Sequence, residues 1–157
     1  MNIKLIVIGK TKSKFLLDGE NEYVKRLEHY CKFSELIIPD IKNGSKLSKK
    51  ELKEKEGNLI LASIKNSDYV ILLDDKGLEL SSTDFAEFLN KKMVSSTNEL
   101  VFVVGGAFGF SESVYRRANT KLSLSKMTFS HQMVRMIFKE QLYRAFSILK
   151  DEKYHHE

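Results

Sequence analysis

Paired glycines, Gly105 and Gly106, follow a short apolar run in the second half of this 157-residue sequence. The run is residues 101–104 (VFVV), and a third glycine stands at Gly109. A buried strand that ends in glycines lets a ligand approach the backbone, because no Cβ stands in the way. Ligands of open α/β sheets bind beyond the carboxyl ends of strands, so the segment predicts a binding site. A tight turn without a ligand would use the same residues, and the spacing matches neither the dinucleotide fingerprint nor a P-loop.

A second candidate segment, residues 122–132 (LSLSKMTFSHQ), combines apolar side chains with hydroxyl groups. Such a mixture can bind the polar edges of a cofactor that lies in an apolar slot. Ser123 and Lys126 also have the S-x-x-K spacing of serine acyl-transfer enzymes, but the companion motifs of those enzymes do not occur in this sequence. The alternative without a ligand is a polar loop that caps the last helix through Ser130.

The last expected helix carries polar or basic side chains at four-residue intervals along one flank, namely His131, Arg135, Lys139 and Tyr143. Like charges four residues apart on a helix repel one another. A basic stripe beside a tyrosine therefore favours contacts with phosphates and stacking on bases. A helix face exposed only to solvent has the same pattern, and Glu140 and Arg144, also four residues apart, can pair with each other.

The sequence ends in residues 154–157 (YHHE), which place an aromatic ring beside two histidines and a carboxylate. A metal site is one interpretation, but adjacent residues rarely converge on one ion, and the other histidines are the distant His29 and His131. Because chain ends usually fray, an aromatic residue and a histidine placed last indicate a tail that docks onto another surface. Cys31 falls on an apolar helical stripe and is expected in the core rather than as a nucleophile.

Composition favours one compact domain over residues 1–157. Apolar residues make up 42% of the chain and charged residues 30%, which excludes a disordered protein. No aliphatic run approaches the roughly 20 residues of a membrane-spanning helix. The single cysteine cannot form an internal disulfide, which suits a reducing cytoplasm, and the net charge of +5 fits a polyanionic partner.

Apolar patterning predicts the elements that must position these residues. Strands are expected at 3–8, 35–39, 68–74, 99–104 and 121–124, and helices at 15–30, 48–64, 81–93, 111–118 and 131–150. Ser48 with Glu51, and Ser81 with Asp84, have the spacing of a capping box at two of the helix starts. Since the strands lack an alternating polar face, the fold class is α/β, with a mostly parallel sheet flanked by helices.

Several segments together resemble the ribosomal RNA large-subunit methyltransferase H family, small members of the SPOUT class. The segments are 4–10 (KLIVIGK), 55–57 (KEG), 103–106 (VVGG), 124–129 (LSKMTF), 131–132 (HQ), 140–145 (EQLYRA) and 154–155 (YH). The resemblance runs from end to end of the chain. It departs from the family pattern at Ser130, where proline is usual, and at His156, where arginine or lysine is usual.

This resemblance implies a fold and an activity. The fold would be of the SPOUT type, with a trefoil knot in its carboxyl-terminal part. The protein would be a cytoplasmic homodimer that uses S-adenosylmethionine to methylate N3 of a pseudouridine in helix 69 of 23S rRNA on the assembled ribosome. Neither a membrane nor a metal ion would take part. The alternative functions, which involve no methyl transfer, are those of a ribosome-associated RNA-binding factor and of a metal-dependent hydrolase.

The resemblance also implies roles for individual residues. The cofactor would be lined by Leu73, Gly105, Leu124, Ser125, Lys126, Met127, Thr128 and Phe129. The rRNA would contact His131, Arg135, Lys139 and Arg144. Catalysis would involve Glu140, Tyr154 and His155, and the two tail residues would reach the cofactor pocket of a partner chain. The N3 proton must leave before or during attack, so a general base would help, and Glu140 or His155 could serve. Glu140 is favoured, because a carboxylate on a rigid helix is better placed than a tail.

Overall fold

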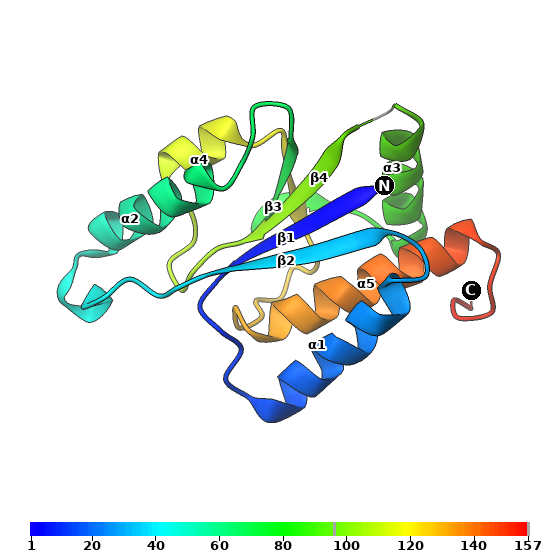
Figure 1. Cartoon of the computed structure of the whole chain (residues 1–157), viewed down its shortest axis with the longest axis horizontal. Coiled ribbons are helices and arrows are strands. Elements are labelled where there is room, and N and C mark those ends of the chain that lie inside the picture. Colours follow the sequence, from blue (N-terminus) through cyan, green and yellow to red (C-terminus); the bar gives the residue numbers. More distant parts are fainter. Residues whose placement is uncertain (96, 157) are drawn as a thin grey trace.

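Five strands form one parallel sheet in the order β2-β1-β4-β3-β5 in the computed structural model, which describes residues 1–95 and 97–156 (Figure 1). The strands are β1 (Asn2–Ile8), β2 (Lys32–Ile38), β3 (Tyr69–Glu79), β4 (Glu99–Val104) and β5 (Thr120–Ser123). The helices are α1 (Lys14–Leu27), α2 (Lys49–Ala62), α3 (Ser82–Val94), α4 (Glu112–Arg117) and α5 (Met133–Leu149), and a short 3-10 helix, η1, covers Gly44–Lys46. The parallel α/β arrangement expected from the sequence is confirmed.

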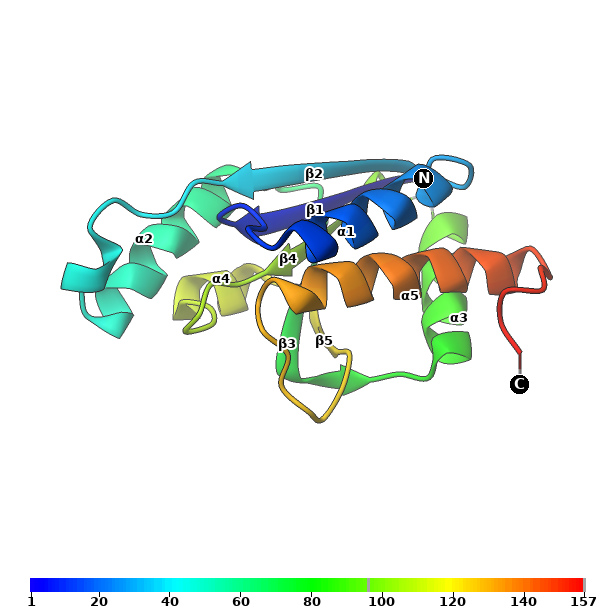
Figure 2. The ribbon, with the colours of Figure 1, turned by 90° about the horizontal axis from the view of Figure 1, so that it is seen from below.

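The sheet is buried on both faces, which explains why its central strands are apolar without alternation. On one face, α1, α3 and α5 cover a core that includes Leu27, Phe85 and Phe138 (Figure 2). On the other face, α2 and α4 contribute Ile60 and Val114 to a second core. Among the described residues, no helix is long and apolar enough to cross a membrane.

Serine side chains begin several helices, as the capping-box spacing predicts. The Ser48 hydroxyl accepts a hydrogen bond from the backbone N–H of Glu51 at 3.1 Å, and Ser81 accepts one from Asp84 at the same distance. Each bond satisfies an N–H that has no partner within its helix. Ser130 accepts from Met133 at 3.1 Å, so this serine also turns the chain into α5.

β3 is longer than the sequence predicts, because it resumes after an interruption. Leu73 and Leu78 both pair with Leu122 of β5, and the register shifts between these two leucines. The charged residues after Leu73 were expected to end the strand at Asp74. Pairing with a strand almost fifty residues later sustains it instead, which no local pattern could indicate.

Gly77 occupies the tightest point of this interruption, and replacing it should destabilise the fold. A Cβ at Gly77 would lie 2.6–2.7 Å from backbone atoms of Lys121 and Leu122, which cannot move without disturbing β5. Gly77→Ala is therefore expected to lower the free energy of unfolding by about 1–3 kcal/mol in urea denaturation. Gly44→Ala is the matched control, since its nearest neighbour is the mobile end of Leu52. Equal stability of the two variants would contradict this packing.

Candidate cofactor site and carboxyl-terminal network

A cavity of about 330 Å³ opens at the interruption of β3 and the carboxyl ends of β4 and β5, a size within the range of small-molecule sites. Its walls come from the interruption of β3, the glycine turn after β4 and the loop between β5 and α5. The lining residues are Leu73, Asp74, Asp75, Val104, Gly105, Gly106, Ala107, Gly109, Phe110, Leu122, Ser123, Leu124, Ser125, Met127, Thr128, Phe129, Ser130, His131 and Val134. The edge of the sheet where the sequence predicts a site therefore carries a cavity.

The glycine turn after β4 presents bare backbone to this cavity. A Cβ at Gly105 would lie 3.2 Å from the Phe110 ring and 3.3 Å from the Gly109 backbone. The turn is closed by a hydrogen bond from the Gly109 N–H to the Gly106 carbonyl at 3.1 Å, and Gly109 has a φ of +83°. Side chains rarely adopt that φ, so a glycine is required there.

The loop between β5 and α5 is shaped by its own hydroxyl groups. The Ser123 hydroxyl donates to the Ser125 carbonyl at 2.8 Å, and the Ser125 hydroxyl accepts from the Met127 N–H at 2.9 Å. Lys126 is exposed and is not among the residues that line the cavity. The Ser123 hydroxyl therefore has a structural partner, and the S-x-x-K spacing places no lysine in the cavity.

Three titratable side chains, Asp74, Asp75 and His131, line the cavity. Asp74 already accepts a short hydrogen bond from the Tyr115 hydroxyl. Burial lowers the pKa of His131 from its ordinary value of 6.5, and the nearby Arg135 guanidinium lowers the pKa further. The histidine at the cavity is therefore an uncharged ring at neutral pH.

Arg135 and Lys139, the two cations of the basic stripe expected along α5, do not face solvent. This corrects the prediction that they contact RNA phosphates. Arg135 is 1% exposed and donates to the carbonyls of Gly9 at 2.7 Å, Ile8 at 2.6 Å and His131 at 3.0 Å. This buried guanidinium ties the end of β1 to the start of α5.

Lys139 is also 1% exposed, and it bridges carboxylates of two other elements. Its Nζ lies 2.5 Å from Glu20 of α1 and 2.7 Å from Glu35 of β2. A buried cation needs such partners. Because Arg135 and Lys139 are internal and fully engaged, neither can reach the phosphates of an RNA at the surface.

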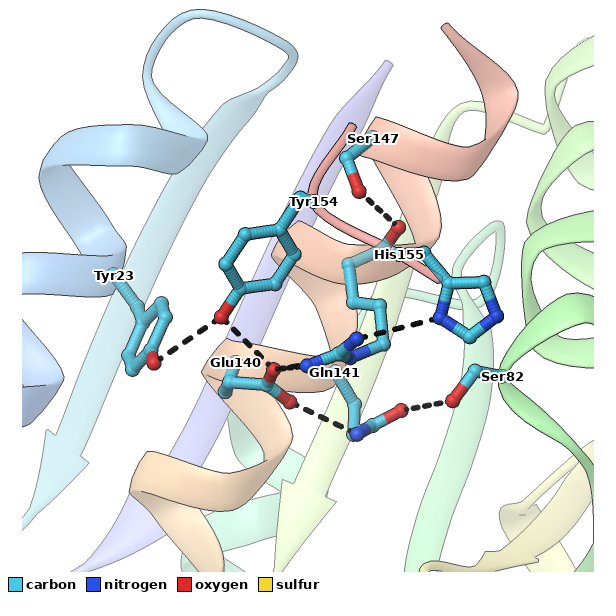
Figure 3. Close-up of polar contacts among 8 residues, drawn as sticks. Tyr23, Ser82, Glu140, Gln141, Ser147, Tyr154 and His155 are labelled. Carbon is cyan, nitrogen blue, oxygen red and sulfur yellow. Dashed lines mark hydrogen bonds and ion pairs between the residues drawn. The ribbon is translucent and has the colours of Figure 1, made fainter. Parts of the chain in front are cut away.

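Glu140 is the centre of a hydrogen-bond network at the middle of α5 (Figure 3). Its Oε1 accepts from Arg144 Nε at 3.0 Å, from Arg144 Nη2 at 2.5 Å and from the Tyr154 hydroxyl at 3.0 Å. Its Oε2 accepts from Gln141 at 2.9 Å. Glu140 does not line the cavity. Within its own chain it is therefore the partner of Arg144 rather than a base at the cavity.

The carboxyl-terminal tail docks on α1 and α5 of its own chain. The Tyr154 ring packs edge-on against Tyr143 with ring centroids 4.7 Å apart, and Arg144 Nη1 lies 3.3 Å from His155 Nδ1. A guanidinium can only donate, so Nδ1 accepts and neutral His155 carries its proton on Nε2. In this conformation Arg144 engages His155 Nδ1, which is therefore not available as a base.

The tail folds back along α5 but does not enter the cavity. Val134, in the first turn of the helix, lines the cavity, whereas the tail follows the last residue, Leu149. The Tyr154 hydroxyl contacts Glu140, which lies six residues after Val134, or about 9 Å along the helix at 1.5 Å per residue. Neither Tyr154 nor His155 is among the residues that line the cavity of their own chain.

Comparison with known proteins identifies the family. Residues 1–155 match the family model described as "Predicted SPOUT methyltransferase". The chain belongs to the SPOUT methyltransferase family. The family resemblance expected from the sequence is confirmed.

Several bacterial proteins share the whole length of this SPOUT methyltransferase. Proteins named ribosomal RNA large subunit methyltransferase H from Parabacteroides distasonis and Flavobacterium johnsoniae are 56% and 57% identical to it over 157 residues, covering all of both chains. The protein of that name from Bacteroides fragilis is 46% identical over the same span.

A solved structure supports the fold. It comes from Haemophilus influenzae Rd KW20 and is described as that of a probable methylase family protein. It aligns with a TM-score of 0.56 at 11% identity, covering 98% of this chain and 68% of the other. The trefoil knot that the family resemblance implies stays a prediction.

Some residues of the site were not anticipated from the sequence. Asp74, Phe110 and Val134 line the cavity, and the hydroxyls of Tyr23 and Tyr30 contact the tail. Asp74 follows an apolar strand, and this position was a signal for its place at the cavity. Tyr23 and Tyr30 lie among apolar residues, which indicate core packing instead. Across residues 1–95 and 97–156, no group of three or more His, Cys, Asp or Glu side chains could hold a metal ion.

Proposed function

We propose that this SPOUT methyltransferase transfers a methyl group from S-adenosylmethionine to N3 of a pseudouridine in helix 69 of 23S rRNA, on the assembled ribosome in the cytoplasm. The chain is 46–57% identical over its full length to proteins named ribosomal RNA large subunit methyltransferase H. These names support large-subunit rRNA as the substrate. The observation that carries the proposal is the cavity at the interruption of β3 and the carboxyl ends of β4 and β5.

The cavity suits S-adenosylmethionine in its chemistry. Leu73, Leu124 and Phe129 provide apolar walls for a ring and a methionine chain, and the bare backbone at Gly105 lets the ligand approach closely. Backbone groups of residues 124–129, including Ser125, Met127 and Thr128, would bind the polar edge of the adenine. When bound, S-adenosylmethionine supplies an electrophilic methyl group on its sulfonium.

Lys126 is better suited to the RNA than to the cofactor, because its exposed ammonium group lies on a loop that borders the cavity. The side chain of Arg144 is 25% exposed and already paired with Glu140, so its contact with RNA would be at most partial. His131, at the cavity, would contact the target nucleoside. The net charge of +5 favours a polyanion.

A complete site would need two chains. Tyr154 and His155 do not line the cavity of their own chain, and a second copy could bring its tail there. Large apolar side chains are exposed on and near the cavity loop, with Met127 77% and Phe129 36% exposed. Such exposure is typical of an interaction surface, so we expect a homodimer.

The chain's own residues would then position the nucleoside and remove its N3 proton. Methyl transfer from a sulfonium needs an aligned nucleophile, so positioning provides much of the acceleration. Glu140 is engaged by four donors, and Arg144 engages His155 Nδ1. Uncharged His131 at the cavity is the better acceptor for the N3 proton.

The pH profile tests His131 as the acceptor. Burial, Arg135 and Lys12 lower its pKa and Asp40 partly offsets them, so the base form persists below pH 6.5. We expect kcat to fall only as pH drops below 6.5. His131→Gln should lower kcat about 100-fold and remove that fall, whereas His29→Gln, an exposed control, should change neither. Full kcat in His131→Gln would contradict the assignment.

The direct test of the proposed function has two parts. Isothermal titration with S-adenosylmethionine should show binding, which a purely RNA-binding protein would not. Mass spectrometry of helix 69, cut from ribosomes incubated with the enzyme and isotope-labelled cofactor, should show one labelled methyl group on pseudouridine. Binding without methyl transfer to the rRNA would contradict the proposed substrate.

A further inference from the structure

Two tyrosines from the first helix region hold the carboxyl-terminal tail. Tyr23 lies in α1, and its hydroxyl oxygen is 3.4 Å from that of Tyr154. Tyr30 lies in the turn after α1, and its hydroxyl donates to Glu152 at 2.5 Å. The tail is therefore attached at two points, one on each side of Lys153.

A third tyrosine joins these contacts into one aromatic surface. The Tyr143 ring of α5 has its centroid 6.2 Å from that of Tyr23, 5.8 Å from that of Tyr30 and 4.7 Å from that of Tyr154. Aromatic rings at such separations attract one another. We call Tyr23, Tyr30 and Tyr143 the tyrosine cluster.

We propose that the tyrosine cluster is a positioning device, in which Tyr23 and Tyr30 hold the tail where Tyr154 and His155 can enter the cofactor site of a second copy. This inference rests on the proposed function and assigns no role in the chemistry to either tyrosine. It adds α1 to the elements on which catalysis depends, although α1 contributes no residue to the cavity.

The direction of the hydrogen bonds explains how Tyr23 acts. The Tyr154 hydroxyl donates its proton to Glu140 at 3.0 Å, so it must accept from Tyr23. The same Glu140 oxygen fixes Arg144, and Arg144 faces His155. The orientation of His155 therefore depends on a chain of contacts that begins at the Tyr23 hydroxyl.

The protonation of these tyrosines keeps the chain of contacts intact. Burial and the hydrogen bond with Tyr23 raise the pKa of Tyr154, with a further contribution from the Glu140 carboxylate. The hydrogen bond to Glu152 is the main cause that raises the pKa of Tyr30. Both hydroxyls keep their protons at neutral pH and continue to donate to carboxylates.

The test removes single hydroxyl groups and leaves the rings in place. Tyr23→Phe and Tyr30→Phe should each lower kcat for rRNA methylation about tenfold and together about a hundredfold, because a small misplacement of a reacting group is costly. The Kd for S-adenosylmethionine should change much less than kcat, since neither Tyr23 nor Tyr30 lines the cavity. Tyr69→Phe is the matched control, a tyrosine whose ring lies under Lys92. Unchanged kcat in the double variant would overturn the proposal.

A double-mutant comparison separates positioning from a general loss of stability. If Tyr23 acts only through Tyr154, Tyr23→Phe should cause no further loss of kcat in a protein that already carries Tyr154→Phe. An equal further loss in that background would show that Tyr23 acts elsewhere, and it would overturn the proposal.

A third measurement does not depend on activity. Trypsin cleavage after the exposed Lys153, followed by mass spectrometry of the released terminal peptide, reports whether the tail is held down. Release should be several-fold faster in the Tyr23→Phe, Tyr30→Phe double variant than in Tyr69→Phe, and equal rates would overturn the proposal. If the unmodified protein proves unable to methylate rRNA, the proposed function fails, while cleavage still tests the attachment of the tail.

Discussion

Replacing His155 with alanine should lower kcat for rRNA methylation by about 100-fold or more, which is the loss typical of a positioned hydrogen-bond donor or proton-transfer group. His155 is held against Arg144 through Nδ1 at 3.3 Å. The Kd for S-adenosylmethionine should change much less than kcat, because the ligand keeps the cavity lining that its own chain provides. Titration calorimetry and initial rates on ribosomes measure the two quantities.

His29→Ala is the control for this substitution, since His29 is an exposed histidine on the turn after α1. It should leave both kcat and Kd as they are. A His155→Ala enzyme with full kcat would show that the tail is only structural, and one that fails to bind the cofactor would show that the tail supports the cavity instead.

Adding a side chain at Gly105 should have the opposite effect to the His155 substitution, because it should weaken the binding of S-adenosylmethionine. Gly105→Val introduces atoms where even a Cβ would meet the Phe110 ring at 3.2 Å and the Gly109 backbone at 3.3 Å. The turn cannot retreat from them, so the new side chain must displace the turn or narrow the cavity. We expect affinity for S-adenosylmethionine to fall about 100-fold or more, since neighbouring groups would lose their contacts with the ligand.

A graded series makes this prediction sharper. Gly105→Ala should lose less affinity than Gly105→Val, and urea denaturation should show that both variants still fold. Gly44→Ala, whose Cβ would meet only flexible side-chain atoms, serves again as the control. Undiminished binding by Gly105→Val would place the cofactor elsewhere.

The sequence predicted the sheet and the glycine turn well, because both follow from local chemistry. Residues 101–104 are apolar without alternation, so the strand had to be buried on both faces. Gly105, Gly106 and Gly109 then mark a place where the backbone must turn tightly. The serines at helix starts, such as Ser48 and Ser81, could be predicted equally well, because a capping side chain bonds to a residue three positions away.

The charged side chains of α5 were harder to assign, because partners distant in the sequence decide their role. A spacing of four residues places Arg135 and Lys139 on one flank but does not say what that flank faces. Glu20 and Glu35, more than a hundred residues earlier, turn Lys139 into a buried ion pair. No local pattern distinguishes this arrangement from a surface stripe.

The contacts of the tail also depend on residues that are distant in the sequence. An aromatic residue and a histidine at the chain end predicted docking, and the structure shows the tail docked on α1 and α5. The partners Tyr23 and Tyr30 lie over 120 residues away in the sequence. Their contacts exist only because α1 packs beside α5, so the tyrosine cluster could not be recognised before the fold was known.

Complementation between two inactive variants tests most directly whether one chain's cavity and another chain's tail form the site. One variant carries Gly105→Val, and the other lacks residues 154–157. In a mixed dimer, one of the two sites combines an intact cavity with an intact tail. Random exchange of subunits makes half of the dimers mixed, so the mixture should recover about one quarter of the activity of the unmodified enzyme. A mixture no more active than either variant alone would contradict a site shared between two chains.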